Sequence, residues 1–344
     1  MAERILITGG TGYIGSHTAV VLTQTGHDIV LYDNLSNSSD VILDALKKII
    51  GKPIPFVKGD IRDTNLLIHT LKSYNINSII HFAGLKAVGE SVEKPLDYFA
   101  NNIQGAISLL NALQKQSIHK FIFSSSATVY GKPQYLPFDE EHPTNALTPY
   151  GRSKTHVEEI LKDLASSNPS FRISCLRYFN PVGAHESGLI GENPKGKPNN
   201  LMPFIAQVAM GDREELCVFG DDYPTSDGTG VRDYIHVMDL AEAHAASLTF
   251  LENNTGWHAF NLGSGTGYSV LELIHAFEEE ANCTIPYRIT DRRASDIAES
   301  YTNPDKAAKL LGWKTKRNIK EMCSTTWQFQ KNLSIQNPLN RIVF

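Results

Sequence analysis

One stretch of the chain carries a tyrosine and a lysine at a spacing that could move a proton. Tyr150 and Lys154 are four residues apart, so on a helix both side chains project from the same face. A tyrosine hydroxyl, with a pKa of about 10, is a weak base at neutral pH. A fixed ammonium beside it favours the phenolate and lowers that pKa. The spacing therefore predicts that Tyr150 is a general acid and base tuned by Lys154.

The surroundings of this pair favour catalysis over a structural role. Thr148 is a suitable N-cap and Pro149 a suitable first-turn residue, so a helix begins just before the pair. Ser126 follows an apolar, strand-like run and could hydrogen-bond the same substrate oxygen as Tyr150. The spacing also arises by chance in a chain of this length, so the pair alone fits a structural role equally well.

A glycine-rich segment follows the first strand-like run. Gly9, Gly12 and Gly15 are spaced Gly-x-x-Gly-x-x-Gly, which lets the main chain approach a pyrophosphate closely, and the helix that follows offers N–H groups to it. A Walker loop is excluded because Ser16 stands where that loop requires lysine. The segment predicts a dinucleotide site, with a simple tight turn as the alternative.

Two acidic residues end the next strand-like runs. A carboxylate at Asp33 would accept hydrogen bonds from an adenosine ribose and repel a 2′-phosphate, which favours NAD over NADP. Asp60 suits either the adenine edge or the N-cap of the following helix. The predicted cofactor is therefore NAD.

The elements that must hold these residues alternate between strand and helix. Helical stretches near 13–25, 40–49, 64–73 and 101–116, and the helix that begins at Pro149, separate apolar runs at 5–8, 29–32, 55–58, 78–82, 121–124 and 173–177. This order predicts an α/β fold with a Rossmann-like, doubly wound parallel sheet. After Pro181 the chain becomes rich in Gly, Pro and Asn. We expect an NAD-binding domain over 1–180. Over 181–344 we expect a smaller mixed α/β domain for the substrate, with some elements returning to the first.

Composition excludes several classes of protein. The chain has 344 residues, 41% hydrophobic and 20% charged, as in ordinary globular proteins. A formal charge of −5 argues against nucleic acid and anionic membranes as partners. The sequence lacks a membrane-span-length apolar run, a signal-peptide layout and a Cys-x-x-Cys motif. The 12 histidines show no ligand spacing, so no metal site is expected. These features predict a cytoplasmic protein.

Seven stretches carry a family resemblance. They are residues 8–16 (TGGTGYIGS), 81–91 (HFAGLKAVGES), 123–131 (FSSSATVYG), 150–154 (YGRSK), 176–184 (LRYFNPVGA), 199–204 (NNLMPF) and 228–239 (GTGVRDYIHVMD). On these stretches the chain resembles the extended short-chain dehydrogenase/reductase family. Within that family it is similar to the branch that interconverts UDP-galactose and UDP-glucose.

The resemblance implies a mechanism and a set of site residues. NAD would stay bound, Tyr150 would remove the 4-hydroxyl proton, Lys154 would hold the NAD ribose, and Ser126 would orient the 4-oxygen. The 4-ketosugar would then rotate and receive hydride on its opposite face. The residues implied for NAD are Gly9, Gly12, Tyr13, Ile14, Gly15, Asp33, Asn34, Asp60, Ile61, Phe82, Ala83, Gly84, Lys86, Asn101, Ser124, Tyr150, Lys154 and Tyr178. Those implied for the UDP-sugar are Lys86, Ser126, Thr128, Tyr150, Asn180, Asn200, Leu201, Phe219, Arg232, Arg293, Asp296 and Ser300.

Two further properties follow from the resemblance. A homodimer would form through the helices around 91–115 and 151–167. Ser300 stands where some members carry a large Tyr and others a small Cys or Ser. A small side chain leaves room beside the sugar's C2, so we also expect conversion between UDP-GalNAc and UDP-GlcNAc.

Other functions remain alternatives. A nucleotide-sugar dehydratase needs an extra acid and base, commonly Asp-Glu after the strand serine, whereas Ala127 and Thr128 follow Ser126 here. A UDP-glucuronate decarboxylase matches the substrate loops less well. An NAD-binding regulator without catalysis would typically lack the Tyr and Lys, and both are present.

Overall fold

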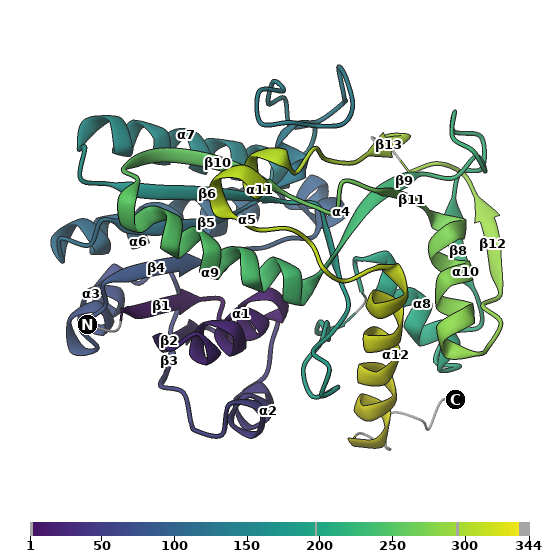
Figure 1. Ribbon diagram of the computed structural model, residues 1–344, viewed down its shortest axis with the longest axis horizontal. Coiled ribbons are helices and arrows are strands. Elements are labelled where there is room, and N and C mark those ends of the chain that lie inside the picture. The colour runs from purple at the N-terminus through teal and green to yellow at the C-terminus, as the bar shows by residue number, and fades with distance from the viewer. Residues whose placement is uncertain (1–2, 197, 294–295, 337–344) are drawn as a thin grey trace.

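The fold is built on one seven-stranded sheet, seen in a computed structural model that describes residues 3–196, 198–293 and 296–336 (Figure 1). The strand order is β10-β6-β5-β4-β1-β2-β3, and every neighbouring pair is parallel. The predicted α/β class and doubly wound sheet are confirmed. The strands are β1 (Arg4–Thr8), β2 (Asp28–Asp33), β3 (Phe56–Lys58), β4 (Ser78–His81), β5 (Lys120–Ser126), β6 (Arg172–Tyr178) and β10 (Gly256–Leu262).

Helices cover both faces of this sheet, as its apolar strands require. Two separate hydrophobic cores result. On one face lie α3 (Thr64–Ser73), α6 (Gly105–Lys115) and α7 (Pro149–Ser167). On the other lie α1 (Tyr13–Gln24), α2 (Val41–Ile50), α9 (Val237–Asn253) and α11 (Asp305–Leu311).

The order of the strands fixes where a ligand can bind. From β1 the chain moves outward through β2 to β3, then returns to β4 on the other side of β1 and moves outward again. The crevice in such a sheet opens at the carboxyl ends of the strands, where the direction of winding reverses. The glycine loop after β1 and the loop after β4 meet at this point.

The structure differs from the helix predicted over 101–116. The helix expected over 101–116 begins as a π-helical turn, η1 (Phe99–Gln104), and two short helices precede it, α4 (Val88–Glu93) and α5 (Pro95–Tyr98). Each is too short for a helical repeat of apolar residues to show in the sequence. Beyond residue 180, β10 joins the large sheet and α9 packs on one of its faces.

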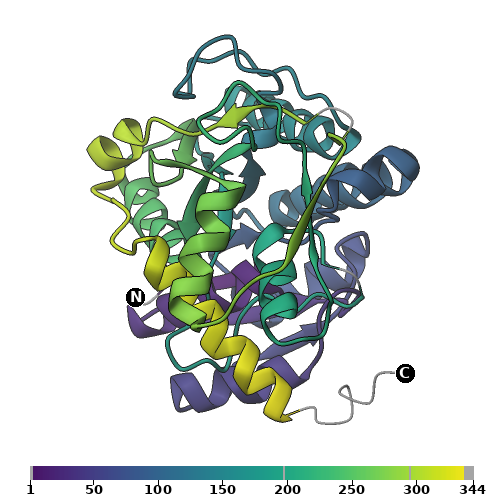
Figure 2. The ribbon, with the colours of Figure 1, turned by 90° about the vertical axis from the view of Figure 1, so that its right-hand side faces the viewer.

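The remaining elements form a second layer with its own core. There α8 (Leu201–Ala209), α10 (Val270–Ala281) and α12 (Ile319–Gln336) pack together, and Figure 2 shows α10 and α12 side by side. The strands here are β7 (Asn180–Val182), β8 (Leu216–Phe219), β9 (Val231–His236), β11 (Gly267–Ser269), β12 (Tyr287–Thr290) and β13 (Glu299–Ser300). Across the described ranges, the helices are all too short or too polar to cross a membrane.

Candidate active site

The glycine loop after β1 is packed so closely that side chains would not fit. Gly9 has a φ of +69°, and a Cβ there would lie 2.6 Å from the main-chain nitrogen of Ala83. A Cβ on Gly15 would collide with the main-chain oxygen of Gly9. The N-cap of α1 is Gly12, which has no side chain to occupy the first N–H groups of the helix. This arrangement leaves the helix start open to an anion such as a pyrophosphate.

Acidic and amide side chains lie at the ends of β2 and β3, beside this loop. The Asp33 carboxylate accepts hydrogen bonds from the main-chain N–H groups of Thr11 (3.2 Å) and Leu35 (2.8 Å), so its position is fixed. Asn34 donates to Asp60 at 3.3 Å. The carboxylates, which can accept from ribose hydroxyls, and the glycine loop together fit an adenosine diphosphate group.

Asp60 does not cap the helix that follows it. Its carboxylate pairs with Arg62, whose hydrogen bonds lower the pKa of Asp60 to about 2. The N-cap of α3 is Asp63, which accepts from the N–H of Leu66 at 3.0 Å. The N-cap reading of Asp60 is therefore wrong. The neighbouring Ile61 is buried in the core under Gly105, so only its main chain could face a ligand.

The proton-transfer residues meet where β5 ends and α7 begins. Thr148 caps α7 as predicted, accepting from the N–H of Gly151 at 3.2 Å. Tyr150 is in the first turn, and the buried Lys154 is one turn further. The Lys154 ammonium donates to the main-chain oxygen of Ser124 at 2.7 Å and lies 5.8 Å from the centre of the Tyr150 ring.

The titration of this pair differs from the prediction. Burial raises the pKa of Tyr150, and a hydrogen bond with Ser126 only partly opposes this effect. Burial also lowers the pKa of Lys154, to about 8. The expected lowering of the Tyr150 pKa by Lys154 is therefore wrong for the protein by itself, because the ammonium is directed at the carbonyl of Ser124.

The loop after β4 is held by an asparagine that the sequence analysis did not single out. The buried Asn102 accepts from the N–H of Leu85 (2.8 Å) and donates to the carbonyl of Leu85 (3.0 Å) and to Ser153 (3.0 Å). It thereby joins this loop to η1 and α7. A π-helical turn is itself a frequent mark of a functional site. The sequence carried no signal that separated Asn102 from the neighbouring Asn101 or from Asn111.

Three further residues implied for NAD, Phe82, Tyr178 and Asn101, have contacts near the carboxyl ends of β4 and β6 or in η1. Phe82 packs on the ring of His244 at 4.8 Å between centroids, and His244 in turn contacts the Tyr178 hydroxyl at 2.5 Å. Asn101 donates to Asn102 at 3.1 Å.

A second group of predicted residues gathers around β9. Arg232 of β9 pairs with Asp296, and Arg293 pairs with the same carboxylate. The guanidinium of Arg293 lies 4.9 Å from the centre of the Phe219 ring. Ser300 of β13 stands opposite Arg232 in the sheet register. Two arginines beside an aromatic ring suit a diphosphate joined to a flat base.

A carboxylate missed in the sequence connects the two groups. Glu192 accepts from the Lys86 ammonium at 2.6 Å and from the Asn200 amide at 2.7 Å. Asn200 is the N-cap of α8, and Leu201 is its first residue. Within the segment 181–200, the sequence offered no reason to single out Glu192 rather than Glu186.

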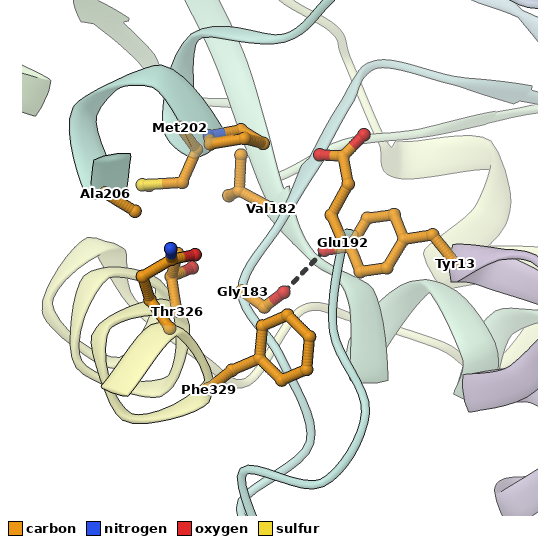
Figure 3. A pocket seen from close by; sticks show the side chains of 10 residues that line it. Tyr13, Val182, Gly183, Glu192, Met202, Ala206, Thr326 and Phe329 are labelled. Atoms are coloured by element: carbon orange, nitrogen blue, oxygen red, sulfur yellow. Dashed lines mark hydrogen bonds between the residues drawn. The ribbon is translucent and has the colours of Figure 1, made fainter. Parts of the chain in front are cut away.

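A small pocket adjoins this contact. Glu192 and Tyr13 face it from one side and Phe329 from another, and the Tyr13 hydroxyl donates to the main-chain oxygen of Gly183 at 2.6 Å (Figure 3). Burial and the charge of Glu192 raise the pKa of Tyr13.

Comparisons with known proteins agree with this geometry. The family described as GDP-mannose 4,6 dehydratase matches residues 6–326. UDP-glucose 4-epimerase from Haemophilus influenzae is 54% identical over 95% of this chain and 97% of its own length. UDP-glucose 4-epimerase from Stenotrophomonas maltophila, solved with NAD and formylated UDP-arabinopyranose, has a TM-score of 0.95 at 49% identity, covering 97% of this chain and 99% of that one. The enzyme from Bifidobacterium longum, solved with NAD+ and UDP, has a TM-score of 0.93 at 49% identity, covering 98% and 99%.

This chain belongs to the UDP-glucose 4-epimerase family. The family in turn belongs to the extended short-chain dehydrogenase/reductases, as the seven sequence stretches indicated. The broader match to a dehydratase family does not extend to the extra acid and base of dehydratase chemistry. Ala127 and Thr128 form a short turn, η2 (Ala127–Val129), in which Thr128 donates to Ser126 at 3.0 Å.

Proposed function

We propose that this protein interconverts UDP-galactose and UDP-glucose with NAD as its cofactor. The observation that carries the proposal is the meeting of Tyr150, Lys154 and Ser126 at the carboxyl edge of the sheet, next to a glycine loop built for a dinucleotide. The high identity to the epimerases over nearly the whole chain supports the same activity.

The residues at the end of β5 and the start of α7 supply the proton chemistry. NAD, when bound, would supply the hydride acceptor and donor that the reaction at C4 needs. Tyr150 removes the proton of the 4-hydroxyl and later returns it to the 4-ketosugar, while Ser126 holds the 4-oxygen. The raised pKa of Tyr150 keeps its hydroxyl protonated in the protein by itself. The positive charge of the oxidised cofactor, when bound, would favour the phenolate and so help Tyr150 to act as a base.

The second group of residues holds the UDP portion while the sugar rotates. Arg232 and Arg293 would take the diphosphate in place of their shared partner Asp296. Phe219 offers a flat apolar face to the uracil. Asn180, Asn200 and Leu201 would complete the site. Because these contacts lie away from C4, the ketosugar can present either face to the cofactor without leaving the protein.

The acceptance of N-acetyl sugars is a separate proposal. Ser300 is small, and its strand β13 runs beside Arg232. We infer that the space beside the sugar's C2 is open to an N-acetyl group, so UDP-GalNAc and UDP-GlcNAc are also substrates.

Exposed apolar side chains support self-association of the protein. Apolar side chains are exposed on neighbouring helices α4, α5 and α6, with Val92 at 62% and Leu96 at 78% exposure. A second copy of the chain would cover such a patch, which supports a homodimer.

All four cysteines lie within the described ranges as free thiols, which supports a cytoplasmic location.

The experiment that tests the function compares two tyrosine variants. Tyr150→Phe should lower kcat by about 10²- to 10⁴-fold while the bound NAD content stays at the wild-type level. Tyr135→Phe, which removes a hydroxyl from a 43% exposed side chain, is the matched control and should retain full activity. Full turnover in the Tyr150→Phe variant would contradict the proposed mechanism.

A further inference from the structure

A buried carboxylate lies one helical turn beyond Lys154. Glu158 is only 4% exposed, and its position on α7 places it on the same helix face as Tyr150 and Lys154. The proton chemistry described above does not involve Glu158, yet burying a charge is costly unless the charge is paired.

Glu158 is paired with the strand that follows α7. Arg177 of β6 donates to it from Nε (3.0 and 3.2 Å) and from Nη2 (2.6 Å), and the Ser125 hydroxyl of β5 donates to the same carboxylate. Ser125 and Arg177 are direct neighbours in the β5–β6 register. The carboxylate is therefore fixed from two adjacent strands and can move little relative to the sheet.

Three consecutive residues of β5, at positions 124–126, contact Lys154, Glu158 and Tyr150. The carbonyl of Ser124 accepts from Lys154, the side chain of Ser125 donates to Glu158, and Ser126 contacts Tyr150. The negative charge of Glu158 raises the pKa of Lys154, against the larger lowering by burial. Arg177 is itself held cationic: burial acts to lower its pKa, but the hydrogen bonds and charge of Glu158 raise it overall.

Other ionisable groups act on Lys154 or on the Glu158–Arg177 pair from the surrounding elements. They are His81 of β4, Cys175 of β6, Glu140, and Tyr130, whose hydroxyl accepts from Arg177 at 2.9 Å. Within the described ranges, Glu158 is the only carboxylate that acts on the titration of Lys154. Burial lowers the pKa of His81 to about 3, so this imidazole is neutral at the pH of catalysis.

We propose that Glu158, fixed by Arg177 and Ser125, is a positioning residue that keeps Lys154 cationic inside the site. This inference rests on the proposed epimerase function. A buried Arg–Glu pair can also serve the fold alone. The two roles differ in one measurable respect, because only the electrostatic role couples Glu158 to the pH at which Lys154 loses its proton.

The test compares the pH dependence of kcat in two neighbouring variants. In the wild type, kcat should fall as pH rises through the Lys154 pKa. In Glu158→Gln this fall should begin about one pH unit lower, so that kcat drops about tenfold at the high-pH end and recovers at low pH, with KM unchanged. Glu159 is the next residue along the chain, and its side chain is 67% exposed. Glu159→Gln removes the same charge there and should leave the pH profile unchanged.

A second variant protects the test against misfolding. Glu158→Met combined with Arg177→Met replaces the buried pair by apolar side chains, which proteins often tolerate. It should show the same shifted profile. An unshifted profile in either variant, alongside active wild-type protein, would overturn the inference and leave the function standing. Wild-type protein without turnover would overturn the proposed function and this inference with it.

Discussion

Ser300 of β13 lies directly opposite Arg232 of β9, in parallel register. The residue that would set the space beside the sugar is thus held by the strand whose arginine would hold the diphosphate. Phe138 and Tyr301 join the same region, because the N–H of Phe138 donates to the carbonyl of Tyr301 at 2.9 Å. The position of Ser300 is therefore fixed from both sides.

The size of the side chain at position 300 should decide which sugars react. Ser300→Tyr would fill the space beside C2, so we expect it to lower kcat/KM for UDP-GalNAc by at least about 100-fold and to change that for UDP-galactose little. Ser300→Ala keeps the site open and should convert both sugars. The readout is coupled product formation for each sugar, and equal loss of both reactions in Ser300→Tyr would refute the size argument.

The glycine loop should not tolerate a single added methyl group. In Gly15→Ala the new Cβ meets the main-chain oxygen of Gly9, so the loop must open and bound NAD should be lost. Gly89→Ala adds the same group in α4, where it meets no atom within 4 Å, and should retain NAD. The measurement is the NAD released per mole of purified, heat-denatured protein. Full NAD content in Gly15→Ala would contradict the assignment of this loop.

Much of this site was predictable because its parts are local in sequence. The glycine loop and the Tyr150–Lys154 pair each lie within one strand–turn–helix or one helix start, where spacing determines geometry. The pairs Glu158–Arg177 and Glu192–Lys86 were not predictable, since their partners are brought together only by the fold. The pKa of Tyr150 was predicted in the wrong direction because spacing does not reveal burial or that Lys154 points to Ser124.

Acid should destabilise the protein through its buried histidines. Burial lowers the pKa of His17 to about 3, below the value near 6.5 in an unfolded chain. The unfolded state therefore binds the additional proton between these values, and stability falls as pH drops below 6.5. At pH 5 this histidine alone would cost about 2 kcal/mol.

The contribution of His17 can be measured by substitution. His17→Leu should lose less stability than the wild type between pH 7.5 and pH 5 in urea unfolding, by up to about 2 kcal/mol. His69→Leu, at an exposed position, should lose as much as the wild type. An identical loss in His17→Leu would show that this ring does not stay neutral in the folded protein.

Association should depend on the apolar side chains of α4 and α5. Leu96→Glu places a charge on a 78% exposed leucine of α5, so we expect it to convert a homodimer into monomers. Leu310→Glu makes the same change on a 44% exposed leucine of α11 and should leave the dimer intact. Light scattering after size exclusion gives the mass of each. A wild-type monomer, or a dimeric Leu96→Glu variant, would contradict the proposed interface.

The central claim is tested most directly by proton NMR of the purified protein mixed with UDP-galactose, with no NAD added. The account predicts that the anomeric signal of UDP-glucose appears and grows to an equilibrium mixture, because the cofactor is retained and regenerated in each turnover. The persistence of UDP-galactose alone, even after NAD is supplied, would contradict it.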